Sequence, residues 1–188
     1  MPFNLKKLAL LAAWIMFAGS AYPQGSLDKL QALVGTSARR LAIAEQVAPA
    51  KWDSGAPVED ASREDHIIVR AIKAGRSRSL DPTSVSNFFR GQIEANKLVQ
   101  YSLLAEWRRV GQAPDHARVD LASTIRPELD EVDEALIAEL EETTTIRAST
   151  SYSTDIAKAA GEYVSAHKKQ FSPLKVVALD RALASACA

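Results

Sequence analysis

The 188-residue sequence has a single cysteine, Cys187, and no excess of charge: 23 Lys and Arg residues balance 23 Asp and Glu residues. One cysteine excludes an internal disulfide framework and any multi-cysteine metal site. A zero net charge argues against a nucleic-acid binder, which normally carries a basic excess. The three histidines, His66, His116 and His167, share no ligand spacing on one face, so we expect no metal.

Glycine, proline and aromatic residues are also scarce, with 8 Gly, 8 Pro, 3 Trp, 4 Tyr and 5 Phe. Ala, Leu and Glu are abundant instead, and these residues favour helices. No segment alternates apolar and polar residues as a strand would, and no internal repeat is present. The hydrophobic fraction of 47% and the charged fraction of 24% are typical of a globular protein. We therefore predict an all-α, single-domain bundle of about six helices.

The first residues have the features of an export signal. Lys6 and Lys7 precede an apolar run, Leu8–Ala18, and small residues follow it up to Ala21. This pattern is typical of a cleavable signal peptide, whereas a membrane anchor needs about 20 apolar residues. We predict a signal peptide over 1–21 and a domain over 22–188, periplasmic or secreted, with no membrane association after cleavage. Cleavage removes two cations, which leaves 21 against 23 acids and a net charge of −2.

Apolar residues at helical spacing predict a first helix from Leu27, which Pro49 should kink or end near its last turn. A second helix is expected to start at a cap, Asp60 or Ser62, and to run toward Gly75.

The clearest start signal is Asp81 followed by Pro82, an N-cap and a first-turn proline. That third helix should end at Gly111. A fourth helix is expected over 121–142, followed by a polar break over 143–154. Two weaker helices, split near Ser172-Pro173, should complete the chain.

Two polar side chains interrupt the apolar stripe of the third helix. Asn96 and Gln100 lie one turn apart on the face that should be buried. Buried amides need partners, because an unsatisfied polar group costs about 1–3 kcal/mol. A hydrogen-bonded pair between helices would explain them without any function.

Charged residues are also found on faces expected to contact the bundle. Arg40 and Lys51 share one face of the first helix, although two surface cations would give the same pattern. Asp60, Arg63 and Glu64 lie within one turn, where capping and a surface ion pair are the simpler explanation. Taken together, the cations and amides suggest a pocket for a small polyanion within a helical bundle.

The same residues belong to a series of short motifs: Arg40-Leu41, Val47-Ala48, Lys51-Trp52, Val58-Glu59-Asp60, Arg63-Glu64, Leu80-Asp81-Pro82, Phe88-Phe89, Gln92-Ile93, Ala95-Asn96-Lys97, Gln100-Tyr101-Ser102 and Trp107. In this order and spacing, they resemble the all-helical chorismate mutases, and most of all the secreted, periplasmic subclass. The resemblance is strong over Leu27–Trp107 and weak over Asp120–Leu140.

The resemblance implies an isomerase that converts chorismate to prephenate by an intramolecular 3,3-rearrangement of a dicarboxylate, with no cofactor. Lys51 and Gln100 match the family positions that donate to the ether oxygen, which gains negative charge as its bond breaks. Arg40 would clamp one carboxylate with its planar fork.

The resemblance also implies supporting roles for other residues. Arg63 would support the carboxylate end, Asp60 and Glu64 would orient the substrate hydroxyl, and Asn96 would contact a carboxylate. Cytosolic members take one further arginine from a dimer partner, whereas the secreted subclass supplies it from a later helix, where Arg126 is the best match.

Two other functions and one assembly stay open at this stage. An isochorismate pyruvate lyase of the same fold would use a similar cationic pocket, and an exported helical binding module would use the polar stripe without catalysis. An arginine from the same chain removes the need for a homodimer without forbidding one.

Overall fold

The computed structural model describes residues 24–186, so the predicted signal peptide and Cys187 lie outside the described residues. The described part contains seven α-helices and no strand, which confirms the all-α prediction. No helix within it combines the length and the hydropathy of a membrane span.

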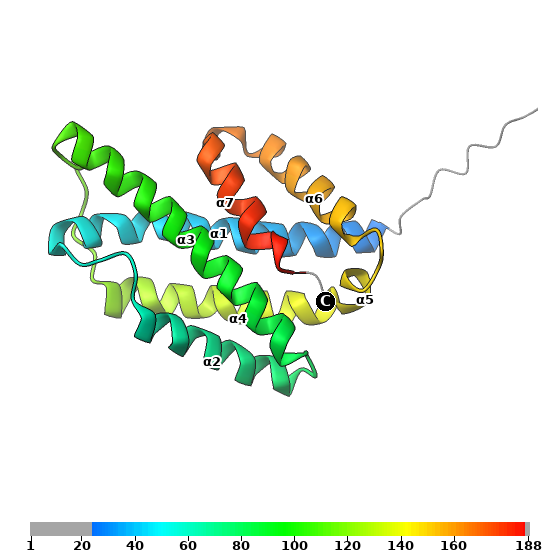
Figure 1. Ribbon diagram of the computed structural model, residues 1–188. Helices are drawn as coiled ribbons and strands as arrows, with labels where there is room; N and C mark the ends of the chain where they lie inside the picture. Colours follow the sequence, from blue (N-terminus) through cyan, green and yellow to red (C-terminus); the bar gives the residue numbers. More distant parts are fainter. Residues whose placement is uncertain (1–23, 187–188) are drawn as a thin grey trace, which may run out of the picture.

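The helices are α1 (Gln24–Ser54), α2 (Ala61–Ser77), α3 (Pro82–Val110), α4 (Arg126–Glu142), α5 (Thr144–Arg147), α6 (Tyr152–Ala166) and α7 (Pro173–Ala184). The long helix α1 crosses α3, with α2 and α4 on one side of the crossing and α6 and α7 on the other (Figure 1). Both α1 and α4 pack against neighbours that lie far from them in the sequence. This arrangement places parts of α1, α2, α3 and α4 around one interior region.

Local capping sets the ends of α2 and α3 as the sequence predicts. The Asp60 carboxylate accepts from the backbone N–H of Arg63 at 3.1 Å, and the Asp81 carboxylate accepts from that of Ser84 at 2.6 Å. Gly111, with φ of 86°, ends α3 in the left-handed conformation that favours glycine.

Three segments differ in detail from the predictions. Of the two alternatives predicted for Pro49, a kink or a helix end, the helix end is wrong, because α1 continues to Ser54. A proline removes one N–H group, but packing of the following turn against α3 retains the helix here. The fourth helical segment begins at 121 as predicted, but its first five residues, Leu121–Ile125, form a π turn before α4. The polar break over 143–154 also contains the short helix α5.

The main core joins α1, α2, α3, α4, α6 and α7. Phe88 and Phe89 of α3 are fully buried and pack edge to face, with 5.7 Å between ring centroids. A smaller cluster joins the end of α1 to the end of α3 through Trp52 and Trp107, whose rings meet edge to face at 5.9 Å. Both clusters hold α1 and α3 together.

Glu139 of α4 is an acidic residue at the edge of this core. Burial raises the pKa of its carboxyl, and a 2.6 Å hydrogen bond from the Thr36 hydroxyl offsets only part of this effect. The second carboxylate oxygen is buried without a hydrogen-bond partner among the described residues. An acid with a raised pKa favours the folded state most when protonated, so its contribution to stability is lost as pH rises through that pKa.

We therefore expect Glu139→Gln to raise Tm by about 2 °C at pH 7 and to leave it unchanged at pH 4, where the native carboxyl is already protonated. Thermal unfolding at the two pH values tests this. Equal Tm values for the two proteins at pH 7 would contradict the assignment.

Candidate active site

A single pocket lies between α1, α2, α3 and the start of α4, and it is lined by every site residue that the sequence predicts. These residues are Arg40, Lys51, Asp60, Arg63, Glu64, Asn96, Gln100 and Arg126. Apolar side chains, among them Val47, Ile93 and Leu129, complete the wall. The residues come from positions up to 86 apart in the sequence, so helix packing is what brings them together.

Arg40 lies in the middle of α1 and is only 1% exposed. Its Nε donates to the Asp133 carboxylate at 2.9 Å, and its Nη1 donates to the backbone carbonyl of Gln92 at 3.1 Å. With the Asn96 amide oriented to satisfy both its ends, Nη1 also donates to the Asn96 side-chain oxygen at 3.0 Å. Nη2 makes no hydrogen bond among the described residues, so this edge of the guanidinium is the one left for a ligand.

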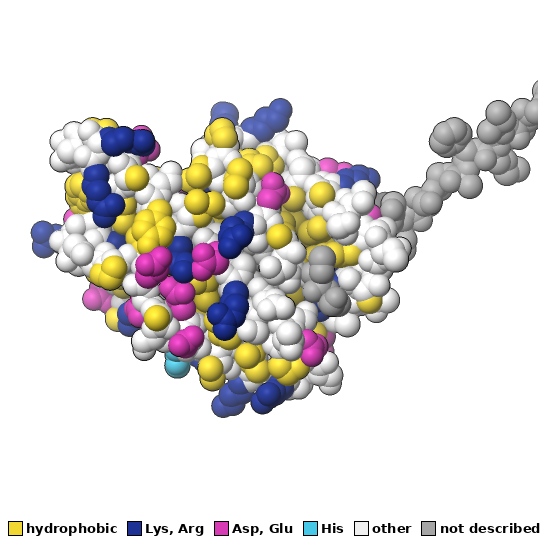
Figure 2. Space-filling model, in the orientation of Figure 1, with side chains coloured by type: hydrophobic (Ala, Val, Ile, Leu, Met, Phe, Trp, Pro, Cys, Tyr) yellow, Lys and Arg dark blue, Asp and Glu magenta, His cyan; other side chains and the backbone are white. Residues whose placement is uncertain are grey.

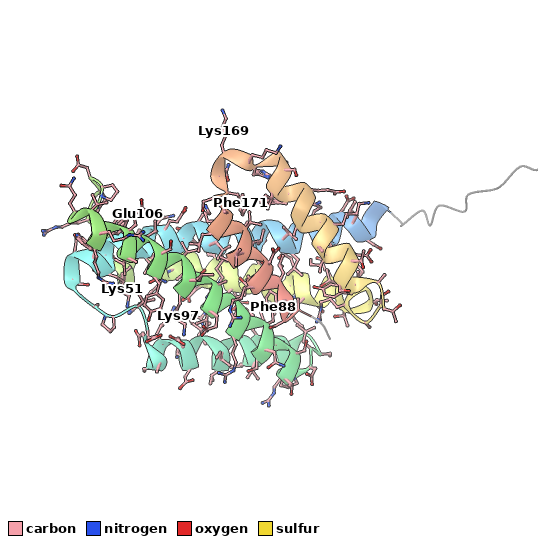
Figure 3. The ribbon with its side chains drawn as sticks, turned by 45° about the horizontal axis from the view of Figure 1, so that its top comes forward. Lys51, Phe88, Lys97, Glu106, Lys169 and Phe171 are labelled. Carbon is pink, nitrogen blue, oxygen red and sulfur yellow. The ribbon has the colours of Figure 1, made fainter. Side chains whose placement is uncertain are left out.

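Lys51 lies in the last turn of α1, two residues after Pro49. Its Nζ donates to the backbone carbonyl of Pro57 at 2.7 Å, which ties the ammonium to the loop between α1 and α2. Figure 3 shows Lys51 and Lys97 on the side where α3 faces α2. A neutral carbonyl partner leaves the positive charge of Lys51 uncompensated, and the ammonium has two further donors.

The first turn of α2 contributes three charged residues. Asp60 caps the helix, and the Glu64 carboxylate accepts from the Asp60 backbone N–H at 3.3 Å, which completes a reciprocal cap. Arg63 points toward α4, where its Nη2 donates to Asp130 at 3.2 Å. The capping explanation is thus confirmed for Asp60, and the same turn also forms one wall of the pocket.

Asn96 and Gln100 are both buried on the inner face of α3, at 7% exposure each. Asn96 is paired with Arg40, so part of its role is structural. The Gln100 amide nitrogen makes only a long contact of 3.4 Å to the Asn96 carbonyl, and its side-chain oxygen has no partner among the described residues. The Gln100 amide is therefore available to a molecule in the pocket.

Arg126 lies where the π turn meets α4. The turn is capped by Asp120, and the Arg126 N–H bonds to the Leu121 carbonyl five residues earlier. Hydrogen bonds from the Ser123 N–H and hydroxyl hold the pKa of the Asp120 carboxyl below its usual range. Among the described residues, the exposed Arg126 side chain makes no hydrogen bond and no ion pair, yet it lines the pocket.

Lys97 also lines the pocket, although the sequence pattern predicts no role for it. Its Nζ contacts the Glu64 carboxylate at 3.3 Å and that of Glu94 at 2.7 Å. Burial lowers the pKa of Lys97, but the bonds to these two carboxylates raise it more, so its pKa lies above the usual value. Glu94 and Lys97 lie three residues apart on one helix, and this spacing is the only feature of the local sequence that indicates an ion pair for Lys97.

The pocket carries a positive charge. Five cations line it (Arg40, Lys51, Arg63, Lys97 and Arg126) against two acids (Asp60 and Glu64), a formal sum of +3. Acidic and basic side chains are intermixed on the surface where α3 passes α2 (Figure 2). Such a site fits a small dianion, because cations and neutral amide donors outnumber the acidic groups.

Comparison with known proteins agrees with this geometry. Residues 30–101 match the family model described as chorismate mutase type II. A crystal structure of chorismate mutase from Burkholderia phymatum is 37% identical, with a TM-score of 0.82, and the match covers 87% of this chain and 99% of that one. The chain belongs to the chorismate mutase family.

Two further chorismate mutases support the assignment. The Burkholderia thailandensis structure is 31% identical, with a TM-score of 0.80, and the match covers 85% of this chain and 99% of that one. A secreted chorismate mutase of Mycolicibacterium smegmatis is 28% identical over 173 residues, which are 90% of this chain and 94% of that protein. The lyase and binding-module alternatives gain no support from these relatives.

The two pocket arginines should differ in their effect on stability. Arg126→Ala should leave Tm within about 1 °C of wild type, because this exposed side chain makes no hydrogen bond and no ion pair among the described residues. Arg40→Met should cost about 3–5 kcal/mol, because it leaves the Asp133 carboxylate without its buried counter-charge. Thermal unfolding of both variants measures this, and an equal loss in Arg126→Ala would contradict the description of Arg126.

Proposed function

We propose that this member of the family converts chorismate to prephenate in the pocket described above. The observation that carries the proposal is that all the residues matching the family's functional positions line one positively charged pocket. The reaction breaks a C–O bond and forms a C–C bond within one molecule, so it requires no covalent intermediate and no proton transfer.

The protein's contribution is to hold the compact conformer and to stabilise the charge that develops on the ether oxygen. Arg40 offers the free edge of its guanidinium to one carboxylate, and Arg126 offers an uncommitted guanidinium to the other. Lys51 and Gln100 donate to the ether oxygen. Arg63 supports the carboxylate end, while Asp60 and Glu64 orient the hydroxyl group and Asn96 keeps Arg40 in place beside a carboxylate.

One chain is sufficient for this site, because Arg126 comes from the same chain as Arg40 and Lys51. The proposed mechanism therefore requires no homodimer. Activity per chain should be independent of protein concentration.

We also propose that the protein is exported. Residues 1–21 have the composition of a cleavable signal, and two relatives are named secreted chorismate mutases. The mature chain would act in the periplasm or outside the cell.

The direct test is an assay of chorismate disappearance and prephenate formation with protein that begins near Gln24. Isochorismate serves as the second substrate. We expect turnover of chorismate, and pyruvate release from isochorismate without chorismate turnover would contradict the proposal.

Lys51→Ala should lower kcat by about 10²–10³-fold or more, because it removes a charge directed at the developing oxyanion. Lys73→Ala is the matched control, since Lys73 is an exposed lysine of α2 outside the pocket. Initial rates at saturating chorismate measure both. A Lys51→Ala enzyme with kcat within threefold of the control would contradict the mechanism.

The value of kcat should be nearly constant between pH 5 and pH 8. Gln100 donates through a neutral amide that does not titrate in this range, and the raised pKa of Lys97 keeps that side chain protonated throughout. A pH–rate profile, with folding checked at each pH, measures this. A steep fall in kcat while the enzyme stays folded would argue against Gln100 as the donor.

A further inference from the structure

Arg40 and Arg63, the arginines that come from α1 and α2, are each held from behind by a carboxylate of α4. Asp133 accepts from Arg40 Nε at 2.9 Å, and Asp130 accepts from Arg63 Nη2 at 3.2 Å. The two aspartates lie three residues apart on α4 and therefore on the same side of that helix. Neither lines the pocket, so both reach the arginines from outside it.

We propose that Asp133 is a positioning residue for the proposed mutase reaction: it orients the Arg40 guanidinium so that Nη2 faces the pocket. Asp130 does the same for Arg63 at a more exposed position. The inference rests on the proposed function, and it extends the site to two residues that do not touch the substrate.

The contacts of Arg40 show why a partner is needed. A guanidinium is planar and carries five N–H donors, and two helices supply its acceptors: the Gln92 carbonyl and the Asn96 side chain from α3, and Asp133 from α4. The two α3 acceptors contact the same nitrogen, Nη1. Contacts at Nη1 alone would let the guanidinium plane rotate about that nitrogen. Asp133 is the acceptor that binds Nε, and it therefore fixes this rotation.

Burial makes this orientation rigid. The side chains of Arg40 and Asp133 are 2% and 13% exposed, so water cannot replace the carboxylate readily. Asp133 also borders a small groove between α2 and α4 with Ile67, Arg70 and Ala71, which places the carboxylate behind the wall. The Arg63 pair is more exposed, at 22% and 35%, and Asp130 is shared with Arg70 at 2.6 Å.

Asp133→Asn tests the proposal, because it keeps the shape of the side chain while removing its charge. Arg40 is expected to bind a carboxylate in both the ground state and the transition state, so a misdirected guanidinium should raise KM. We expect KM for chorismate to rise about tenfold or more while kcat changes less than threefold. A displacement of about 1 Å can cost up to about 10²-fold in kcat/KM.

A purely structural role would give a different result. Partial unfolding lowers the concentration of active enzyme, so the apparent kcat falls while KM stays the same. That result, or an unchanged kcat/KM, would overturn the proposal. Glu134→Gln is the matched control, because Glu134 is an exposed neighbour on α4 with no hydrogen bond or ion pair among the described residues, and its KM should stay within twofold of wild type.

Two further variants test the positioning role if Asp133→Asn folds poorly. Asp130→Asn removes the more exposed pair and should raise KM about threefold or more with a normal unfolding curve; an unchanged KM would overturn the assignment for Asp130. In an Arg40→Lys background, Asp133→Asn should change KM less than threefold, because an ammonium has no plane to orient; a full additive loss would contradict the pairing.

Calorimetric titration with prephenate separates this inference from the proposed function. Wild-type protein that binds prephenate but does not convert chorismate would contradict the proposed function alone. Weaker prephenate binding by Asp133→Asn than by Glu134→Gln would still support the positioning role, and equal binding would overturn it.

Discussion

The buried charge of Arg40 is the constraint on which the site depends. A cation at 1% exposure is tolerated only when it is paired and hydrogen-bonded. Its partners come from α3 and α4, so meeting this requirement fixes three helices relative to one another. These partners bind Nε and Nη1 and leave Nη2 for a ligand. The contacts that make the buried charge tolerable in the folded protein therefore also orient Arg40 for binding.

The other charged residues of the pocket differ in how far protein partners compensate their charge. Arg63 has an acidic partner on α4, and Glu64 has a basic partner in Lys97. Lys51 is held by a neutral carbonyl, and Arg126 has no hydrogen bond or ion pair among the described residues. The two least compensated cations are therefore those to which the proposed mechanism assigns the most direct contacts with the substrate, at the ether oxygen and at one carboxylate.

Local chemistry explains which parts of the fold were predictable. Asp60, Asp81 and Gly111 set helix ends through bonds within a few residues, so the sequence predicts these ends correctly. The continuation of α1 past Pro49 and the π turn before Arg126 depend on packing against distant helices, which no local pattern contains. A proline in the sequence shows only that one backbone N–H donor is missing, and whether the helix continues depends on its tertiary contacts.

The residues of the site likewise fall into two groups: those that the sequence indicates and those that only the packed structure reveals. Arg40, Asn96 and Gln100 stand out as polar residues on apolar faces, and the family resemblance adds Arg126. Asp133 directly follows Val132, which belongs to the apolar stripe of α4. An acidic residue beside such a stripe normally indicates a solvated edge, and the partner of Asp133 lies 93 residues away in the sequence. Lys97 gives the same difficulty, because its contact with Glu64 spans 33 residues. Such pairs become visible only when the helices are packed.

The most direct test of the central claim is a crystal structure with a non-reactive dicarboxylate ether bound, a molecule that holds the compact shape of the rearranging substrate. We expect one carboxylate within hydrogen-bonding distance of Arg40 Nη2, the other near Arg126, and the ether oxygen between Lys51 Nζ and the Gln100 amide. An ether oxygen that lies away from both Lys51 and Gln100, with the carboxylates on other residues, would contradict the account.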